Sequence, residues 1–396
     1  MLKVCINHDT GGRRGGHHTE YSFTGLPGVE IAALSDVNPE AEKTFRLTGA
    51  QRRYESFTTM VETEHPDIVV LCSRLPGEHY EQIKFALEHH CHVLCEKPLA
   101  ESPEQADELA ALAKKTGCLV QMAHLARFAP TFREMKRMIH AGEIGRILTC
   151  YMRGKEDTRG GGEDMLVLGT HVLDAAAWIF GRPEQVYSDI RIGGRPITAT
   201  DVLETTEPLG PCGGDEVYSL YRFPGGVNGV FESRRVVEKG DQRLGITVCG
   251  TTGILTIRYT GNRELRICRD FPAPVEDRSE FEVVTPPEDA PIPGAVPLDH
   301  EKLGIDTTKY LHLYFTENNR RAAWNLLRAI RGEEPLVAGI DSALDSLEMI
   351  TGAYQSALAH APVSFPLASN ETVIVPTPSD VIGQRTFVFM RGTAPD

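Results

Sequence analysis

Residues 2–36 read LKVCINHDTGGRRGGHHTEYSFTGLPGVEIAALSD, and this stretch decides the fold of the first part of the chain. It contains two short apolar runs, Leu2–Ile6 and Val29–Ser35, which have the composition of buried strands. A glycine cluster and enough residues for a helix separate the two runs. Two strands joined in this way indicate a right-handed βαβ unit, with which a parallel sheet begins.

The loop after the first run has the composition of a phosphate-binding turn. Its glycines lie close to the spacing Gly-x-Gly-x-x-Gly, with Thr10 at the first position. Backbone N–H groups in such a loop, together with a helix N-terminus, can hold a pyrophosphate. Asp36 ends the second run, where a carboxylate accepts a ribose 2′-hydroxyl and repels a 2′-phosphate. We therefore expect NAD as the cofactor, with NADP as the alternative that the two arginines keep open, and contacts from Thr10, Gly11, Gly12, Arg13, Arg14, Gly15 and Asp36.

The alternation of strand and helix continues to residue 125. The sequence predicts strands at Ile68–Cys72, Val93–Cys95 and Leu119–Ala123, and helices at Glu78–His90 and Pro103–Thr116. This order predicts an α/β fold with a doubly wound parallel sheet, a Rossmann domain over residues 1–125.

Beyond residue 125 the pattern changes to strand-like runs separated by turns. Val217–Phe223 and Val227–Val236 flank Pro224-Gly225-Gly226, which marks a hairpin. Helices are predicted at 164–180 and 342–359. We therefore expect a second, α+β domain with a large, mostly antiparallel sheet over residues 126–366, followed by a C-terminal extension at 367–396.

The composition narrows the class of protein. The 396 residues carry a net charge of −14, so binding to the phosphate backbone of a nucleic acid is not expected. No stretch approaches the ~18 consecutive apolar residues of a membrane span. The nine cysteines show no framework spacing, and the first residues run straight into a strand pattern without a secretory signal. These features predict a cytoplasmic protein with reduced, buried thiols.

The most specific stretch is His92–Leu99, which reads HVLCEKPL. Lys97 directly follows a predicted parallel strand, at the edge of the sheet where ligands bind in such folds. A lysine buried there can lose its proton near neutral pH, because burial disfavours the charged form. It can then act as the general base that takes a hydroxyl proton while hydride leaves the same carbon.

Taken together, these motifs resemble the Gfo/Idh/MocA oxidoreductases, named for glucose-fructose oxidoreductase and inositol dehydrogenase. The residues that carry the resemblance extend over about 1–366 and are Ala33–Asp36, Pro66–Val70, Val93–Pro98, Arg127-Phe128, Gly142–Gly145, Gly169–Asp174 and Glu317–Arg320. The resemblance implies a tightly held NAD(P), a sugar or cyclitol substrate, Lys97 as the family's lysine and His171 as its acid/base histidine. It also implies that the second domain binds the substrate and that its open sheet supports a homodimer or homotetramer.

The predicted helix at 164–180 departs from the family pattern. Many members carry an aspartate four residues before the histidine, where this chain has Val167. Residues 164, 167, 171 and 174 share one stripe of a regular helix, so Asp164 lies one turn further along the same face. We expect Asp164 to take the place of the missing carboxylate as a catalytic residue.

The remaining candidates come from the same two regions. Ser73, His79 and Glu96 join Lys97 as expected cofactor contacts, and His124, Arg127, Arg159 and Asp174 are expected substrate contacts. No metal site is expected, because the histidines of His89–His92 are adjacent rather than spaced to converge on an ion.

The sequence therefore predicts an NAD-dependent oxidoreductase that transfers hydride between nicotinamide and a sugar or cyclitol, with Lys97 and His171 as proton-transfer groups. One alternative is a glycoside-cleaving enzyme that uses NAD for transient oxidation followed by elimination, without net redox change. The other is a non-catalytic NAD-binding regulatory protein.

Overall fold

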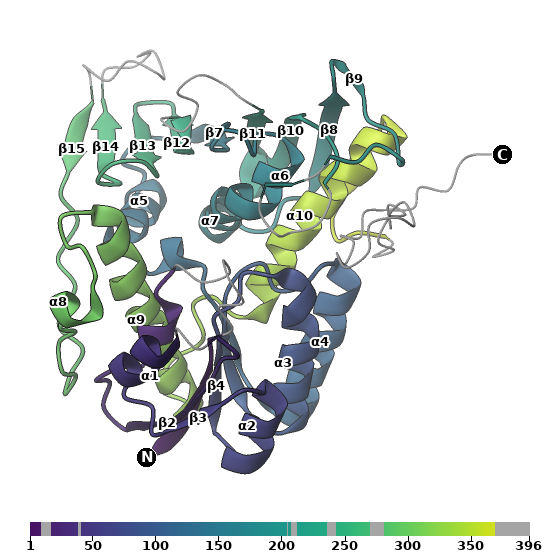
Figure 1. Ribbon diagram of the computed structural model, residues 1–396. Helices are drawn as coiled ribbons and strands as arrows, with labels where there is room; N and C mark the ends of the chain where they lie inside the picture. The colour runs from purple at the N-terminus through teal and green to yellow at the C-terminus, as the bar shows by residue number, and fades with distance from the viewer. Residues whose placement is uncertain are drawn as a thin grey trace. The chain divides into compact units, whose positions relative to one another are not determined.

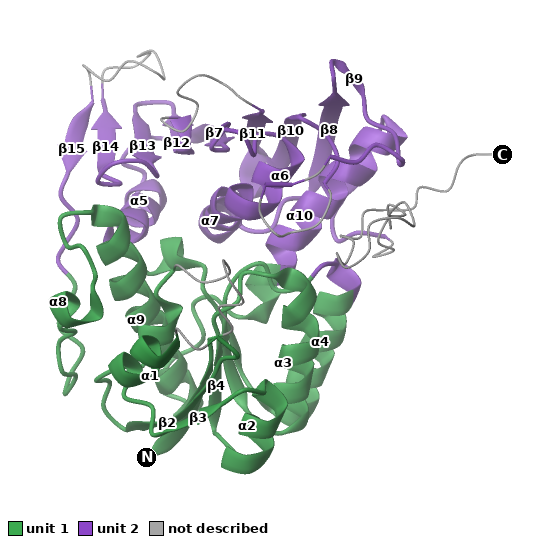
Figure 2. Ribbon diagram, viewed as in Figure 1, with its two compact units in different colours: residues 1–100, 105–129, 289–343 green, residues 101–104, 130–288, 344–396 purple. Residues whose placement is uncertain are grey.

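The computed structural model describes residues 1–8, 17–38, 41–203, 205–206, 212–235, 243–269 and 281–368. The chain folds into two compact units, drawn in different colours in Figure 2. Unit 1 consists of Met1–Ala100, Gln105–Ala129 and Asp289–Ala343, and unit 2 of Glu101–Glu104, Pro130–Glu288 and the chain from Leu344 onward.

Unit 1 is built on a six-stranded parallel sheet in the order β3-β2-β1-β4-β5-β6 (Figure 1). Its strands are β1 (Leu2–Asn7), β2 (Val29–Ser35), β3 (Arg52–Tyr54), β4 (Ile68–Leu71), β5 (His92–Cys95) and β6 (Val120–Met122). This is the strand order of a doubly wound dinucleotide-binding fold, so the expected architecture is confirmed.

Unit 1 also contains helices and short helical turns. They are η1 (Thr19–Tyr21), α1 (Glu42–Thr48), α2 (Phe57–Glu64), α3 (Pro76–Glu88), α4 (Pro103–Thr116), η3 (Leu125–Arg127), α8 (His300–Leu303) and α9 (Tyr310–Ile330), and α4 begins in unit 2. The hydrophobic pattern of the sequence did not predict β3 and α2. Ser56 is the N-cap of α2, and its side chain accepts the N–H of Thr59 at 3.2 Å. A serine at this position is a signal in the sequence for the start of a helix.

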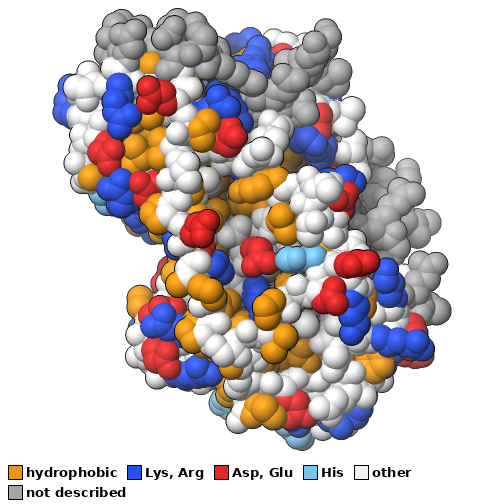
Figure 3. Space-filling model, turned by 90° about the vertical axis from the view of Figure 1, so that its left-hand side faces the viewer, with side chains coloured by type: hydrophobic (Ala, Val, Ile, Leu, Met, Phe, Trp, Pro, Cys, Tyr) orange, Lys and Arg blue, Asp and Glu red, His pale blue; other side chains and the backbone are white. Residues whose placement is uncertain are grey.

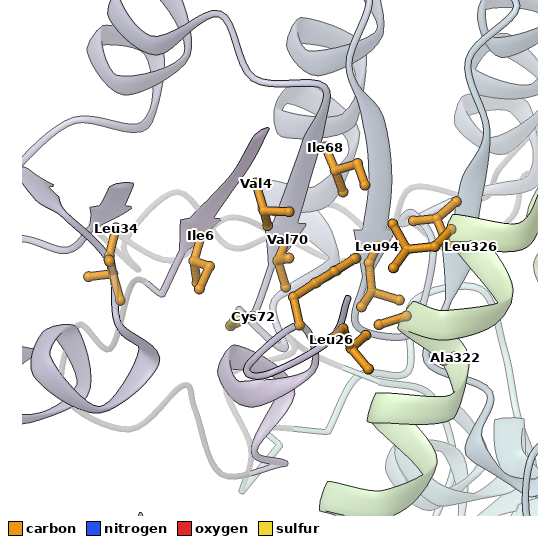
Figure 4. Packing of buried hydrophobic residues seen from close by; sticks show 14 of the residues in the cluster. Val4, Ile6, Leu26, Leu34, Ile68, Val70, Cys72, Leu94, Ala322 and Leu326 are labelled. Carbon is orange, nitrogen blue, oxygen red and sulfur yellow. The ribbon is translucent and has the colours of Figure 1, made fainter. Parts of the chain in front are cut away.

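The core of unit 1 explains why residues 289–343 belong to it rather than to the region 126–366 in which the sequence analysis placed them. Figure 4 shows Ala322 and Leu326 of α9 beside Leu94 of the sheet. Val4, Ile68 and the other strand residues of this cluster are buried with them. A helix that is distant in sequence therefore covers one face of the parallel sheet.

Unit 2 is built on a ten-stranded sheet in the order β15-β14-β13-β12-β7-β11-β10-β8-β16, with β9 paired to β8. All its pairings are antiparallel except that of β7 with β11, which confirms a mostly antiparallel sheet. The strands are β7 (Ile147–Arg153), β8 (Gln185–Ile192), β9 (Arg195–Pro196), β10 (Glu216–Phe223), β11 (Val227–Arg234), β12 (Gly245–Gly250), β13 (Ile254–Arg258), β14 (Leu265–Cys268), β15 (Glu282–Val284) and β16 (Val363–Ser364).

The helices of unit 2 lie on one side of this sheet (Figure 1). They are α5 (Pro130–His140), α6 (Gly162–Asp164), α7 (Thr170–Phe180) and α10 (Ile340–Ala359), of which α10 begins in unit 1. Strand β11 alternates buried and half-buried residues, as expected of a sheet covered on one face. On the other face Tyr187 and Leu220 are exposed.

The predicted continuous helix at 164–180 is interrupted. Residues Met165–Gly169 form a π-helical turn, η4, between α6 and α7. A π turn takes about one residue more than an α turn, so the residues before and after it do not share one stripe. The spacing argument that placed Asp164 on the face of His171 was therefore wrong.

All nine cysteines lie in the described ranges, each is buried, and none forms a disulfide. Among the described residues, no helix is long and apolar enough to cross a bilayer. Basic and acidic side chains are interspersed on the face shown in Figure 3. The extension beyond residue 368 lies outside the described residues.

Candidate functional site

The carboxyl ends of the parallel strands in unit 1 collect polar side chains. Ligands of doubly wound folds bind at this edge. The residues that the strands deliver there are His8 after β1, Asp36 after β2, Ser73 after β4, Glu96 and Lys97 after β5, and His124 after β6.

Asp36 is held in a fixed orientation. The residue is 2% exposed, and its Oδ2 lies 2.7 Å from Nδ1 of His8. Its Oδ1 accepts the backbone N–H of Asn38 at 2.8 Å. A buried, pre-oriented carboxylate after β2 fits the ribose of NAD, because it is an acceptor for hydroxyl donors and carries the charge that repels a phosphate. His8 is a residue of this site that the sequence analysis missed; its position directly after β1 was the available signal.

The predicted phosphate contacts Thr10, Gly11, Gly12, Arg13, Arg14 and Gly15 lie outside the described residues. Their role stays a prediction.

Glu96 points into unit 1 rather than serving as an open carboxylate at the strand end. It is 1% exposed and accepts hydrogen bonds from Nδ1 of His17 at 3.1 Å and from Oγ1 of Thr19 at 2.5 Å. Burial raises the pKa of Glu96, but the charge and hydrogen bond of His17, with Lys97 and Thr19, outweigh this and lower it to about 2. Glu96 is thus a buried anion that ties η1 to the end of β5.

Lys97 follows this anion and is itself almost completely buried, with 3% exposure. The Glu96 carboxylate and the Lys97 ammonium attract each other. Strand β5 pairs with β4 along its whole length, Ile68 opposite His92 and Leu71 opposite Cys95. The position at which Lys97 leaves the sheet is therefore fixed by the register of the two strands.

Ser73 and His79 are engaged by their own surroundings. The Ser73 hydroxyl donates to Oε2 of Glu78 at 2.9 Å and accepts the N–H of Leu75 at 3.2 Å. His79 is fully buried, with Nδ1 2.6 Å from the carbonyl oxygen of Pro98 and Nε2 2.7 Å from that of Ser73. Because both ring nitrogens face backbone carbonyls, the structure does not support the expected contact of His79 with a cofactor.

Arg127 and His124 lie after β6. Arg127 is 8% exposed and donates from Nη1 to the carbonyl oxygen of Val337 at 3.0 Å. This bond ties η3 to the segment before α10, which gives the arginine an anchoring role besides the predicted substrate contact. His124 is 1% exposed and precedes η3, where its carbonyl accepts the N–H of Arg127.

In unit 2, α7 carries His171 and Asp174. His171 is half-buried, and its ring lies 6.2 Å from that of Tyr259 between centroids. The Tyr259 hydroxyl donates to the backbone carbonyl of His171 at 3.5 Å. Asp174, three residues further along the helix, is 1% exposed. The helix thus presents one half-buried imidazole and one buried carboxylate on neighbouring turns.

Asp164 is captured by the sheet instead of lying on the stripe of His171. It is fully buried, and its Oδ2 accepts the Ser233 hydroxyl at 2.6 Å and the N–H of Glu156 at 3.1 Å. A Cβ at Gly154 would lie 2.0 Å from this oxygen, so any larger residue there would displace the carboxylate. Burial raises the pKa of Asp164 to about 6 despite these donors. The predicted catalytic role of Asp164 is therefore not supported.

Arg159 and the three glycines that follow it also pack inward. The Arg159 guanidinium donates to Asp157 at 3.1 and 2.7 Å. A Cβ at Gly160 would come within 1.9 Å of the carbonyl oxygen of Arg234, so this loop lies against the end of β11. The expected substrate contact of Arg159 competes with its ion pair to Asp157.

A buried carboxylate lies just before this loop. Glu156 is fully buried, 3.0 Å from Nη1 of Arg243. Burial and the neighbouring charge of Glu232 raise the pKa of Glu156 to about 7, although Arg234 and Arg153 oppose this. Among the described residues, no three His, Cys, Asp or Glu side chains are arranged to hold a metal ion.

The comparisons with known proteins agree with this architecture. Residues 10–124 match the model of an oxidoreductase family with an NAD-binding Rossmann fold, GFO_IDH_MocA, and residues 132–256 match the C-terminal domain of that family. The chain is 26% identical over 309 residues to levoglucosan dehydrogenase of Pseudarthrobacter phenanthrenivorans. This match covers 71% of this chain and 78% of that protein. It is 31% identical over 170 residues to D-glucoside 3-dehydrogenase of Escherichia coli, covering 39% of this chain and only 48% of that protein.

Among solved structures, levoglucosan dehydrogenase in complex with NADH and levoglucosan superimposes with a TM-score of 0.68 at 20% identity, covering 92% of this chain and 99% of that one. At this identity the likeness shows the fold. The two domain models belong to one family and match consecutive parts of the chain. The first match covers strands β2–β6 of the parallel sheet, and the second covers strands β7–β12 of the mostly antiparallel sheet. The chain therefore belongs to the Gfo/Idh/MocA family of oxidoreductases.

Proposed function

We propose that this protein is an NAD-dependent dehydrogenase or reductase that acts on a CH–OH group of a sugar or cyclitol. The observation that carries the proposal is the buried Lys97 at the carboxyl end of β5, in a sheet whose strand order is that of dinucleotide-binding domains. The names of the relatives support the substrate class, since they include dehydrogenases of glucosides, levoglucosan and scyllo-inositol.

Asp36 supports NAD in preference to NADP. Its carboxylate is buried at the end of β2 and fixed by His8 and by the N–H of Asn38. A ribose 2′-hydroxyl can donate to such a group, whereas a 2′-phosphate would bring a second negative charge against it. Bound NAD would accept or release the hydride.

Lys97 is proposed as the group that takes the substrate's hydroxyl proton in oxidation and returns it in reduction. Its enclosed position keeps water away and allows its proton to be exchanged with the substrate. His171, half-buried on α7, is proposed as the second proton-transfer group. Asp174 is buried on the same helix. We propose that it either anchors the helix and His171 or contacts the substrate.

The test is a substrate panel. Purified protein is incubated with levoglucosan, alkyl and aryl glucosides, free aldoses and inositols, each with NAD and with NADP, and reduced nicotinamide is followed by its absorbance. We expect turnover with NAD for at least one polyol of this panel, abolished in Lys97→Met. Binding of NAD without turnover across the panel would favour the non-catalytic regulatory alternative.

A second candidate function is cleavage of a glycoside by transient oxidation and elimination. The observation that favours it is Val167, a buried aliphatic residue of the π turn where a carboxylate is expected for a simple dehydrogenase. Release of the aglycone from an aryl glucoside without accumulation of NADH would establish this activity. Accumulation of NADH in proportion to oxidised sugar would exclude it.

A further inference from the structure

One imidazole in unit 1 joins the loops that follow two neighbouring strands. His79 belongs to the first turns of α3 and has no exposed surface. Its Nε2 lies 2.7 Å from the Ser73 carbonyl oxygen, in the loop after β4, and its Nδ1 lies 2.6 Å from the Pro98 carbonyl oxygen, in the loop after β5. Both distances are those of short hydrogen bonds, and the ring spans the gap between the two strand ends.

The residue next to one of these carbonyls is Lys97. Pro98 follows it directly, so a bond to the Pro98 carbonyl oxygen fixes the peptide unit just beyond the lysine. Glu96 on the other side is held by His17 and Thr19. Lys97 thus lies between two braced residues, one fixed through its carboxylate and the other through its backbone.

The chemistry of the ring sets a condition on this brace. A carbonyl oxygen only accepts, so each ring nitrogen must donate, and a neutral imidazole has one N–H. Burial lowers the pKa of His79, and the Lys97 ammonium acts in the same direction, while the two carbonyls and the Glu96 carboxylate favour the charged ring. Both bonds exist together only in the imidazolium form, and a neutral ring keeps one of them.

We propose that His79 is a positioning residue for Lys97: by holding the carbonyl of Pro98 against the loop of Ser73, it fixes the direction in which the lysine side chain leaves the sheet. The proposal rests on the proposed function, in which Lys97 transfers the proton. A misplacement of a reacting group by ~1 Å can lower a rate by ~100-fold. His79 therefore influences the rate of the chemical step indirectly, by positioning Lys97, and does not itself transfer the proton.

The experiment compares His79→Phe, which keeps a ring but has no donor, with His79→Gln, which keeps an N–H donor. With the sugar that the wild type turns over, we expect kcat to fall ~10- to 100-fold in His79→Phe and less in His79→Gln. The apparent pKa in the pH profile of kcat should shift in His79→Phe, because Lys97 meets a changed environment. The dissociation constant for NADH, measured by fluorescence, should change little.

The matched control is His92→Gln. His92 lies in the same unit at the opposite end of β5, and its Nδ1 accepts the N–H of Leu119 at 2.9 Å. A purely structural role of a buried histidine would lower Tm in both variants without changing either pH profile. Wild-type kcat and pH profile in His79→Phe would overturn the proposal, and if that variant does not fold, the same result in His79→Leu, which also lacks a donor, would do so.

A structural comparison separates this proposal from the proposed function. Crystal structures of the wild type and His79→Phe, or His79→Leu in its place, are determined with NADH bound. We expect the Pro98 carbonyl oxygen and the Lys97 side chain to be displaced in the variant. If no sugar of the panel is turned over by the wild type, the proposed function has failed, and the displacement still decides whether His79 positions Lys97. An unmoved Lys97 would contradict the proposal.

Discussion

The Lys97 turn of unit 1 and the 164–174 segment of unit 2 each carry a proposed proton-transfer group, but they are built differently. Around Lys97, hydrogen bonds from η1 and α3 reach both neighbouring residues. In the segment before His171, the Asp164 carboxylate is held by the Ser233 hydroxyl of β11. A strand end is fixed by its pairing with neighbouring strands, whereas the face of a helix depends on every turn before it.

The largest effect should come from Lys97, which is the first test of this comparison. Lys97→Met removes the proton-transfer group but retains the buried aliphatic chain. We expect kcat to fall by ~10³-fold, within the range for general acid–base catalysis, while NADH binding is retained. Lys97→Arg is the control, because it keeps the charge but cannot lose a proton near neutral pH. A nearly active Lys97→Arg would show that charge, not proton transfer, is what Lys97 supplies.

The 164–174 segment of unit 2 is tested through Asp164, by the pH dependence of the free energy of unfolding. Its pKa is raised from 3.8 to about 6 in the folded state. Its contribution is therefore fully present below the unfolded pKa and is lost as the pH rises through about 6. The stability of the wild type relative to Asp164→Asn should fall between pH 4 and 7 by up to ~3 kcal/mol, since one pKa unit corresponds to ~1.4 kcal/mol. Urea unfolding at several pH values measures this difference.

The Asn variant retains an oxygen that can accept the Ser233 hydroxyl, so it removes the titration without removing the contact. Ser233→Ala is the matched variant, because it removes a donor to the same oxygen. It should raise the pKa of Asp164 further and extend the loss of stability to higher pH. A pH-independent difference between wild type and Asp164→Asn would show that Asp164 titrates normally.

The contrast between strand ends and helix faces also explains which parts of the fold and of the candidate site could be predicted from the sequence. Apolar strands and the residues directly after them, Asp36 and Lys97 among them, were placed correctly because parallel strands bring their carboxyl ends to one edge. The position of Asp164 could not be predicted, since the spacing of 164 and 171 assumes an unbroken α-helix and residues 165–169 form a π turn. The partners of Glu96 and His79 come from distant or backbone groups, which leave no periodic signal in the sequence.

His171 should show a smaller effect than Lys97. His171→Asn retains a polar side chain on α7 but removes the imidazole. We expect kcat to fall ~10- to 100-fold, because the second proton-transfer group assists without replacing the base. His140→Asn is a suitable control, since its Nε2 lies 2.9 Å from the carbonyl oxygen of Ile179, elsewhere in unit 2. A loss as large as that of Lys97→Met would reverse the assignment of the main base.

The smallest effect concerns Asp36, a second braced strand end in unit 1. Asp36→Ser removes the charge but keeps a hydroxyl that can bond a ribose. We expect NAD to bind ~10-fold more weakly, since a hydrogen bond to a charged group contributes ~1.5–3 kcal/mol. NADP should bind more tightly than it does to the wild type, because the repulsion of its 2′-phosphate is gone. Asp67→Asn, at the opposite edge of the sheet, where Asp67 accepts the N–H of Lys3 at 2.7 Å, is the charge-matched control. An equal loss of affinity for both cofactors would mean that Asp36 acts only by holding His8 in place. The end of β2 would then have a structural role and would not discriminate between NAD and NADP.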